Sequence, residues 1–201
     1  MADFELGALA DTVHRPRLMV RNETRYLCVR GWRANGKADQ VAAVKAQKKM
    51  FRPPFVAAAA LELAQALRAL FGPLTTASVT SVPCGHSRRP DCAGAQIAAA
   101  VALNLGADHR PRFRNRFCRG VSHPKENARL APIEIVDASP SPLVIVVDDI
   151  ATTGWHFEEA LTALRRKGLV AFGAAWISRE LAASQSSEAD DDPPLLTALP
   201  W

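Results

Sequence analysis

Two adjacent carboxylates, Asp148 and Asp149, follow a short apolar run and precede a small, hydroxyl-bearing turn that ends in Gly154. The apolar run, residues 143–147, is typical of a strand that is buried on both faces of a parallel sheet. Open α/β sheets bind ligands at the carboxyl ends of such strands. The backbone N–H groups of a tight turn before a helix can bind phosphate. The spacing therefore predicts a site for a sugar that carries a phosphate.

An amphipathic helix is expected directly after this turn, over residues 154–167. Four apolar residues recur at the i, i+3, i+4, i+7 spacing of a helix with one buried face: Phe157, Ala160, Leu161 and Leu164. Gly168 is a suitable end for this helix. A strand is expected next, over residues 169–177. A strand–helix–strand order favours a parallel sheet.

Residues 143–156 resemble the phosphoribosyl pyrophosphate (PRPP) motif of type I phosphoribosyltransferases. That motif has four apolar residues, two acids, two apolar or small residues, a small residue, then Thr-Gly and two further positions. By this resemblance, Asp148 and Asp149 bind the ribose hydroxyl groups, serve as catalytic residues and help to place Mg²⁺, partly through water. The resemblance assigns the 5′-phosphate to the loop residues Ala151, Thr152, Thr153, Gly154, Trp155 and His156.

Two positions of the loop depart from that family, and a third lacks an acid that some members carry. Trp155 stands where a small residue or Lys is usual, and we expect it to stack or pack. His156 stands where Thr or Ser is usual. A histidine can still donate a hydrogen bond to phosphate, and it suits phosphate when charged. Thr152 stands where some members carry an Asp that assists at the base, so no such carboxylate is expected.

A second turn follows the strand expected at residues 77–82. Exposed backbone amides and two arginines at a strand end can hold pyrophosphate. The family has its pyrophosphate loop at this place. The segment resembles the ComF-type (competence-associated) branch through Val82-Pro83, Arg88-Arg89 and the alanine-rich run after Gln96. The residues assigned to this loop are Cys84, Gly85, His86, Ser87, Arg88 and Arg89. Arg88 is also assigned to catalysis, and the alternative is an ordinary arginine-bearing surface turn.

Basic residues dominate residues 110–129, where Glu126 is the single acid. Type I enzymes carry a loop here that closes over pyrophosphate and excludes water from the reactive sugar. The resemblance assigns to this flexible loop Arg119, His123, Lys125 and Arg129, with Lys125 also catalytic. Two alternatives stay open: a solvated basic face, or binding of an RNA or DNA backbone. Phe113 and Phe117 then fit base stacking, although core packing is preferred.

The predicted fold class is α/β, with the phosphoribosyltransferase type I fold: a mainly parallel sheet flanked by helices, with a small N-terminal hood. The expected organisation is an N-terminal hairpin or hood (1–36), a phosphoribosyltransferase-like core (37–180) and a disordered acidic tail (181–201). The hairpin is expected to turn at residues 21–24. Further helices are expected at 36–50, at 53–71 and at 90–105, and a poor strand with alternating arginines at 111–117.

The composition is that of an ordinary soluble domain, with 48% hydrophobic and 22% charged residues. The net charge of +5 suits an anionic ligand. We expect no membrane partner, because no apolar run approaches the length needed to span a bilayer and no signal peptide is evident. The four cysteines lack C-x-x-C spacing, so free thiols and a cytoplasmic location are expected.

Together these patterns predict an enzyme that binds PRPP with Mg²⁺ and transfers the phosphoribosyl group to a nitrogen nucleophile, with release of pyrophosphate. The acceptor is expected to be selected by the segments around Tyr26, Trp32 and Phe51. The alternative is a non-catalytic regulator on the same fold that senses PRPP or a nucleotide, or a DNA-uptake accessory. The expected partner is PRPP or a nucleotide, with nucleic acid as second choice, and a homodimer is compatible with this interpretation.

Overall fold

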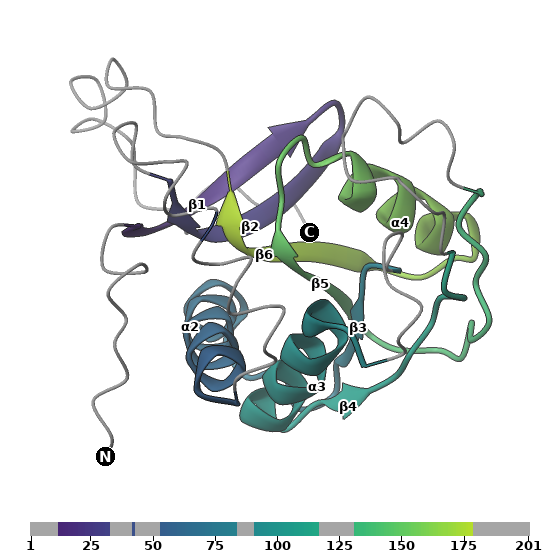
Figure 1. Ribbon diagram of the computed structural model, residues 1–201. Helices are drawn as coiled ribbons and strands as arrows, with labels where there is room; N and C mark the ends of the chain where they lie inside the picture. The colour runs from purple at the N-terminus through teal and green to yellow at the C-terminus, as the bar shows by residue number, and fades with distance from the viewer. Residues whose placement is uncertain (1–11, 33–41, 43–52, 84–90, 117–130, 179–201) are drawn as a thin grey trace.

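The computed structural model describes residues 12–32, 42, 53–83, 91–116 and 131–178. Figure 1 shows a six-stranded sheet with helices on both faces, in the strand order β1-β2-β6-β5-β3-β4. The strands are β1 (Val13–Arg21), β2 (Thr24–Gly31), β3 (Ser78–Ser81), β4 (Asp108–His109), β5 (Val144–Ile150) and β6 (Ala171–Ser178). The helices are α2 (Pro53–Phe71), α3 (Ala93–Leu105) and α4 (Trp155–Arg166). The predicted α/β class, with a mainly parallel sheet flanked by helices, is confirmed.

The predicted N-terminal hairpin is present as β1 and β2, which pair antiparallel around a turn at Asn22. Strand β2 then pairs in parallel with β6, so the hairpin extends the main sheet. All other neighbouring strands also pair in parallel. The division into hood, core and tail stays a prediction, since residues 1–11, 33–41 and 179–201 lie outside the described part of the chain.

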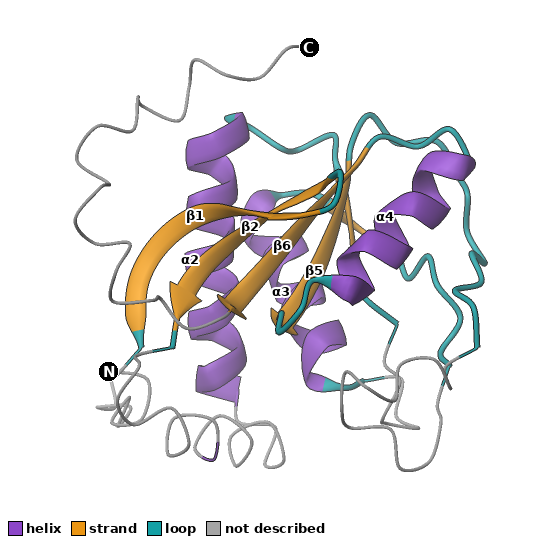
Figure 2. Cartoon of the chain, turned by 90° about the horizontal axis from the view of Figure 1, so that it is seen from above, coloured by secondary structure: helices purple, strands orange, loops and turns teal. Residues whose placement is uncertain are grey.

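Helices α2 and α3 cover one face of the sheet (Figure 2). Helix α2 begins at Pro53, where a missing N–H leaves no hydrogen bond unmade, and Gly72 follows its end with a φ of +74°. Its 19 residues are apolar enough to cross a membrane by length and composition, which corrects the expectation that no run is long enough. The core helix of a soluble protein passes the same test, and Leu63 and Leu67 of α2 are fully buried against the sheet.

Helix α4 covers the opposite face of the sheet (Figure 2). The four residues predicted for its buried side are all fully buried: Phe157, Ala160, Leu161 and Leu164. They pack with Val144 and Val146 of β5. The helix ends at Arg166, with Lys167 as its C-cap and Gly168 following at a φ of +75°, as the sequence predicts.

The strand predicted at residues 111–117 is wrong. The described part of this segment makes one isolated antiparallel bridge, between Phe113 and Ile135. The alternating arginines fail to make a strand with one solvated face because Arg112 and Arg116 are themselves buried. Phe113 is buried in the core under α4, as preferred over base stacking. The helix predicted at 36–50 falls outside the described residues except Ala42, as does Phe117.

Candidate functional site

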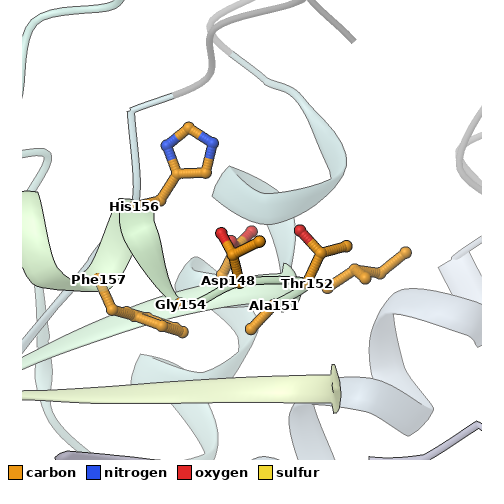
Figure 3. Close-up of a pocket in the computed structure, with 8 residues that line it drawn as sticks. Asp148, Ala151, Thr152, Gly154, His156 and Phe157 are labelled. Carbon is orange, nitrogen blue, oxygen red and sulfur yellow. The ribbon is translucent and has the colours of Figure 1, made fainter. Parts of the chain in front are cut away.

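The predicted phosphate loop connects the carboxyl end of β5 to the first turn of α4. Strand β5 runs through Ile150, so the two acids belong to the last part of the strand and do not follow it. The loop and the strand end line a small, open pocket (Figure 3). The residues that line it are Asp148, Ile150, Ala151, Thr152, Thr153, Gly154, His156 and Phe157. The structure thus brings Asp148 and five of the six predicted loop residues to one pocket, with Trp155 outside its lining.

The two acids are directed differently, because successive side chains of a strand point to opposite faces of the sheet. Asp148 continues the row of Val144 and Val146, lines the pocket and is partly exposed. By this alternation Asp149 falls in the row of Ile145 and Val147; it is 7% exposed and is not among the residues that line the pocket. Its backbone N–H donates to the Asp148 carboxylate at 2.9 Å. The structure therefore does not bring Asp149 to the pocket lining.

Gly154 makes the sharp turn into α4, at a φ of +70° that favours glycine. A Cβ atom at this position would lie 2.9 Å from Cε1 of Tyr26. Tyr26 is buried directly under the loop, where its ring stacks on Phe157 with centroids 4.8 Å apart. The second strand of the hairpin therefore supports the phosphate loop from below, and only glycine fits above it.

The hairpin turn also holds the loop from the side, through Arg21. Its Nη1 donates to the Thr153 carbonyl at 3.1 Å, and its Nε donates to Glu158 of α4 at 2.7 Å. A hydrogen bond from Asn22 and the adjacent Arg21 keep the pKa of Glu158 below its usual value. The sequence-based prediction missed Arg21, because 132 residues separate it from Thr153; an acid in the first turn of α4 was the one local hint of a basic partner.

A buried arginine, Arg116, contacts both unusual loop residues. Its guanidinium lies 5.5 Å from the Trp155 ring centroid, and its Nη2 is 3.1 Å from Nδ1 of His156. Its Nη1 donates to Glu159 at 2.7 Å and to the Ala131 carbonyl at 3.1 Å. The Trp155 and His156 rings meet edge to face, 5.2 Å apart. Trp155 therefore packs against this cluster, one of the two roles expected of it.

The interpretation of residues 110–116 as a solvated basic face is wrong for two of its arginines. Arg112 is fully buried and donates to Ser78 and to the carbonyls of Asp137 and Ser139. The side chain of Arg116 is 3% exposed. Arg110 and Arg114 do lie at the surface, where they pair with Asp108 and Glu134. Partners from segments distant in the sequence decide which arginines are buried, and the charge pattern alone cannot reveal this.

The other predicted contacts to pyrophosphate lie outside the described residues. These are Cys84, Gly85, His86, Ser87, Arg88 and Arg89 of the pyrophosphate loop and Arg119, His123, Lys125 and Arg129 of the flexible loop. Their roles stay predictions. Cys28 and Cys92 are free thiols, and burial raises the pKa of Cys28 to about 11, which leaves it inert as a nucleophile.

Tyr26 and Trp32, from two of the segments expected to select the acceptor, are not among the residues that line the pocket. Tyr26 is 2% exposed and Trp32 is 3% exposed, and each packs in a core cluster. These two side chains support the sheet and the loop, and selection of the acceptor by the segments around them stays a prediction. Phe51 lies outside the described residues.

A magnesium ion fits the pocket only in part. Within the described part of the chain, no group of three or more His, Cys, Asp or Glu side chains could hold a metal ion. Mg²⁺ is often bound by one or two carboxylates together with substrate phosphates and water. Asp148 can serve as such a ligand from the pocket wall. Asp149, on the other face of β5, stays a predicted ligand.

No protein-family model matches the chain, and no curated protein matches it. Solved structures similar to it include an orotate phosphoribosyltransferase from Aeropyrum pernix, with 17% identity over 89% of this chain and 81% of that chain and a TM-score of 0.40. A Helicobacter pylori xanthine-guanine-hypoxanthine phosphoribosyltransferase shares 17% identity over 63% of this chain and 82% of that chain, with a TM-score of 0.38. A Corynebacterium diphtheriae phosphoribosyltransferase shares 23% identity over 61% and 62%, with a TM-score of 0.33.

The sheet order and the geometry of the loop, and not these similarities, are the basis for the function proposed for this chain. None of these three proteins is described as ComF-type. The resemblance to that branch therefore stays a prediction.

Proposed function

We propose that this protein is a phosphoribosyltransferase that binds PRPP with Mg²⁺ and transfers the phosphoribosyl group to a nitrogen nucleophile. One observation carries the proposal: the pocket at the carboxyl end of β5 is formed by the glycine turn and by Asp148. In an open α/β sheet this edge is the ligand-binding edge. A sugar phosphate needs hydrogen-bond donors for its phosphate oxygens and an acceptor for its hydroxyl groups. The backbone amides of the turn and the Asp148 carboxylate provide both in one pocket.

The turn is suited to the 5′-phosphate because it leads into the N-terminus of α4. The first amides of a helix lack partners inside the helix and carry partial positive charge. Arg21 holds the Thr153 carbonyl toward the hairpin. Because C=O and N–H point in opposite directions across a trans peptide, the Gly154 N–H is directed away from Arg21. The loop thus holds the Gly154 N–H as a prearranged donor, while the Trp155 N–H makes a long hydrogen bond of 3.4 Å to Thr153 Oγ1 that a phosphate oxygen would replace.

The reaction breaks the bond between C1 of the ribose and an oxygen of pyrophosphate, and it forms a bond between C1 and the acceptor nitrogen. Asp148 would accept hydrogen bonds from the ribose and keep the sugar oriented while positive charge develops at C1. Mg²⁺ would supply positive charge that stabilises the departing pyrophosphate. The arginines predicted for residues 84–90 would add to this stabilisation.

Calorimetry with PRPP and Mg²⁺ tests the binding part of the proposal. We expect saturable binding, with a thermal stabilisation of about 2.7 kcal/mol at 100 times the dissociation constant. A screen for pyrophosphate release over nucleobases and other nitrogen nucleophiles then tests the transferase activity. If millimolar PRPP with Mg²⁺ neither releases heat nor shifts the melting temperature, the proposal fails.

A second candidate is a non-catalytic PRPP- or nucleotide-binding protein on the same fold. The burial of Asp149 favours it, because one acid of the predicted pair is 7% exposed and does not line the pocket. Tight PRPP binding without pyrophosphate release for any acceptor would support this candidate over the enzyme.

A further inference from the structure

Arg116 is buried beside the first turn of α4 with its charge aimed at the phosphate loop. Its side chain is 3% exposed, and Glu159 balances its charge at 2.7 Å. Burying an ion pair carries a large desolvation cost that its own attraction does not always recover. The Nε atom of Arg116 has no hydrogen-bond partner. Stability alone is therefore a poor explanation for this buried ion pair. The contacts of Arg116 with the phosphate loop offer a better one.

The contact between Arg116 and His156 determines which ring nitrogen of the histidine carries a proton. A guanidinium group has only N–H donors and no acceptor. Its Nη2 lies 3.1 Å from Nδ1 of His156, so Nδ1 must accept this hydrogen bond through its lone pair. The proton of the neutral ring is then on Nε2.

The His156 ring stands at the rim of the pocket, on the same side of the loop as the Asp148 side chain (Figure 3). With Nδ1 accepting from Arg116, Nε2 carries the proton that the neutral His156 ring can donate. We propose that Arg116 is a positioning residue that fixes His156 as the Nε2–H tautomer, so that Nε2–H donates to an oxygen of the sugar phosphate. The inference rests on the proposed function of the loop.

The need for such a residue follows from the replacement of a hydroxyl by an imidazole. A Thr or Ser hydroxyl rotates and can always turn its proton toward a phosphate oxygen. A neutral imidazole is a donor at one nitrogen and an acceptor at the other, and the wrong tautomer would point a lone pair at the phosphate. Arg116 removes this ambiguity, and the Trp155 ring packs against its guanidinium.

The tautomer can be measured without any ligand. The full chain has five histidines, and labelling them with ¹⁵N while comparing the parent with His156→Gln assigns the His156 ring. We expect Nδ1 to resonate as an unprotonated nitrogen and Nε2 as a protonated one. In Arg116→Met the ring should sample both tautomers. A protonated Nδ1 in the parent would overturn the inference.

A double-mutant cycle then tests whether the tautomer serves binding, with ribose 5-phosphate as the probe. A Gln side chain has N–H donors that need no tautomer, so His156→Gln should remove the dependence on Arg116. Arg116→Met should weaken probe binding about tenfold in the parent, as for loss of one hydrogen bond to a charged group. The same change should have less than a twofold effect beside His156→Gln. An equal loss in both backgrounds would overturn the inference.

The matched control is Arg114→Met, which removes the same charge two residues away. Arg114 is exposed and pairs with Glu134 at the surface, without contact to the loop. We expect it to leave probe binding unchanged within twofold. If it weakens binding as much as Arg116→Met does, net charge explains the effect and the inference is wrong. A parent that shows the expected tautomer but binds neither ribose 5-phosphate nor PRPP would overturn the proposed function, and with it the donor role of His156.

Discussion

The two faces of the sheet are covered by different kinds of side-chain contact. The face under α2 and α3 is closed by alanine and branched aliphatic side chains, joined by a few large aromatic residues such as Trp176. The face under α4 places Tyr26 and Phe157 beneath a glycine turn and has Arg116 buried beside it. Aliphatic packing is non-directional, whereas hydrogen bonds and tight ring contacts fix orientation. The comparison indicates that the first face supplies stability and the second fixes the geometry of the site.

The largest effect should come from the aliphatic face and should leave the site intact. Leu63→Ala removes a fully buried side chain from α2. We expect unfolding to become easier by about 2–5 kcal/mol, from lost transfer energy and the cavity left behind. Denaturant unfolding measures this loss. Below the melting temperature, the variant should bind PRPP with the parent's affinity; a large loss of affinity would show that the two faces are not separable in this way.

Gly154→Ala should damage both stability and binding. Alanine is strained at this positive φ, and its Cβ would lie 2.9 Å from Cε1 of Tyr26. Strain of about 1–2 kcal/mol and overpacking of about 1–3 kcal/mol predict a total destabilisation of about 2–5 kcal/mol. We also expect the loop to lose most of its affinity for PRPP in calorimetry.

Gly72→Ala is the matched control for this change. Gly72 has a similar φ of +74°, but no atom lies within 4 Å of the position that its Cβ would take. The Gly72→Ala variant should therefore lose about 1–2 kcal/mol of folding stability from strain alone and keep its affinity for PRPP. Equal effects at the two glycines would mean that Tyr26 does not limit the loop.

The two acids should differ in their effect on binding. Asp148→Asn removes a charge from the pocket wall and should weaken binding of PRPP with Mg²⁺ by about tenfold or more. Asp149→Asn changes a buried side chain on the other face of β5, so its effect on affinity should be smaller. Parallel calorimetric titrations measure both. A larger loss with Asp149→Asn would restore the paired ribose role that the motif implies.

The smallest effect should be a dependence of stability on pH that arises from Glu62 of α2. Burial raises the pKa of Glu62, but hydrogen bonds from Arg30 and Trp176 outweigh it, so the net pKa lies below the usual 4.5. This stabilisation is present above pH 4.5 and is lost as the pH falls through the lowered value. Unfolding of Glu62→Gln between pH 3 and pH 6 should depend less on pH than unfolding of the parent. An unchanged pH dependence would contradict the role of Glu62.

Local patterns in the sequence were sufficient to predict the helix and the turn around the phosphate loop. The spacing of Phe157, Ala160, Leu161 and Leu164 predicted the buried side of α4, because helical periodicity depends only on neighbours in the sequence. The glycine turn was predicted for the same reason. The end of β5 was placed three residues too early, because an acid pair was expected to lie beyond the strand, whereas alternation lets the strand carry both acids.

The contacts that hold the site could not be predicted from the sequence. Arg21 reaches across 132 residues to the loop, and Arg116 reaches across 40 residues to His156. From the sequence, an arginine indicates only a positive charge. Such a charge is compatible with a solvated surface, a nucleic-acid interface or a buried ion pair. Tertiary packing determines which of these applies, and Arg116 is buried.

The central claim is that residues 151–156 form the phosphate site. Amide ¹H–¹⁵N spectra recorded during titration with ribose 5-phosphate test it most directly, because each backbone donor reports separately. We expect saturable shifts concentrated at Thr152, Thr153, Gly154 and Trp155, with the surface around Leu103 of α3 unchanged. Saturable shifts that cluster elsewhere, while the amides of the loop stay unperturbed, would contradict the claim.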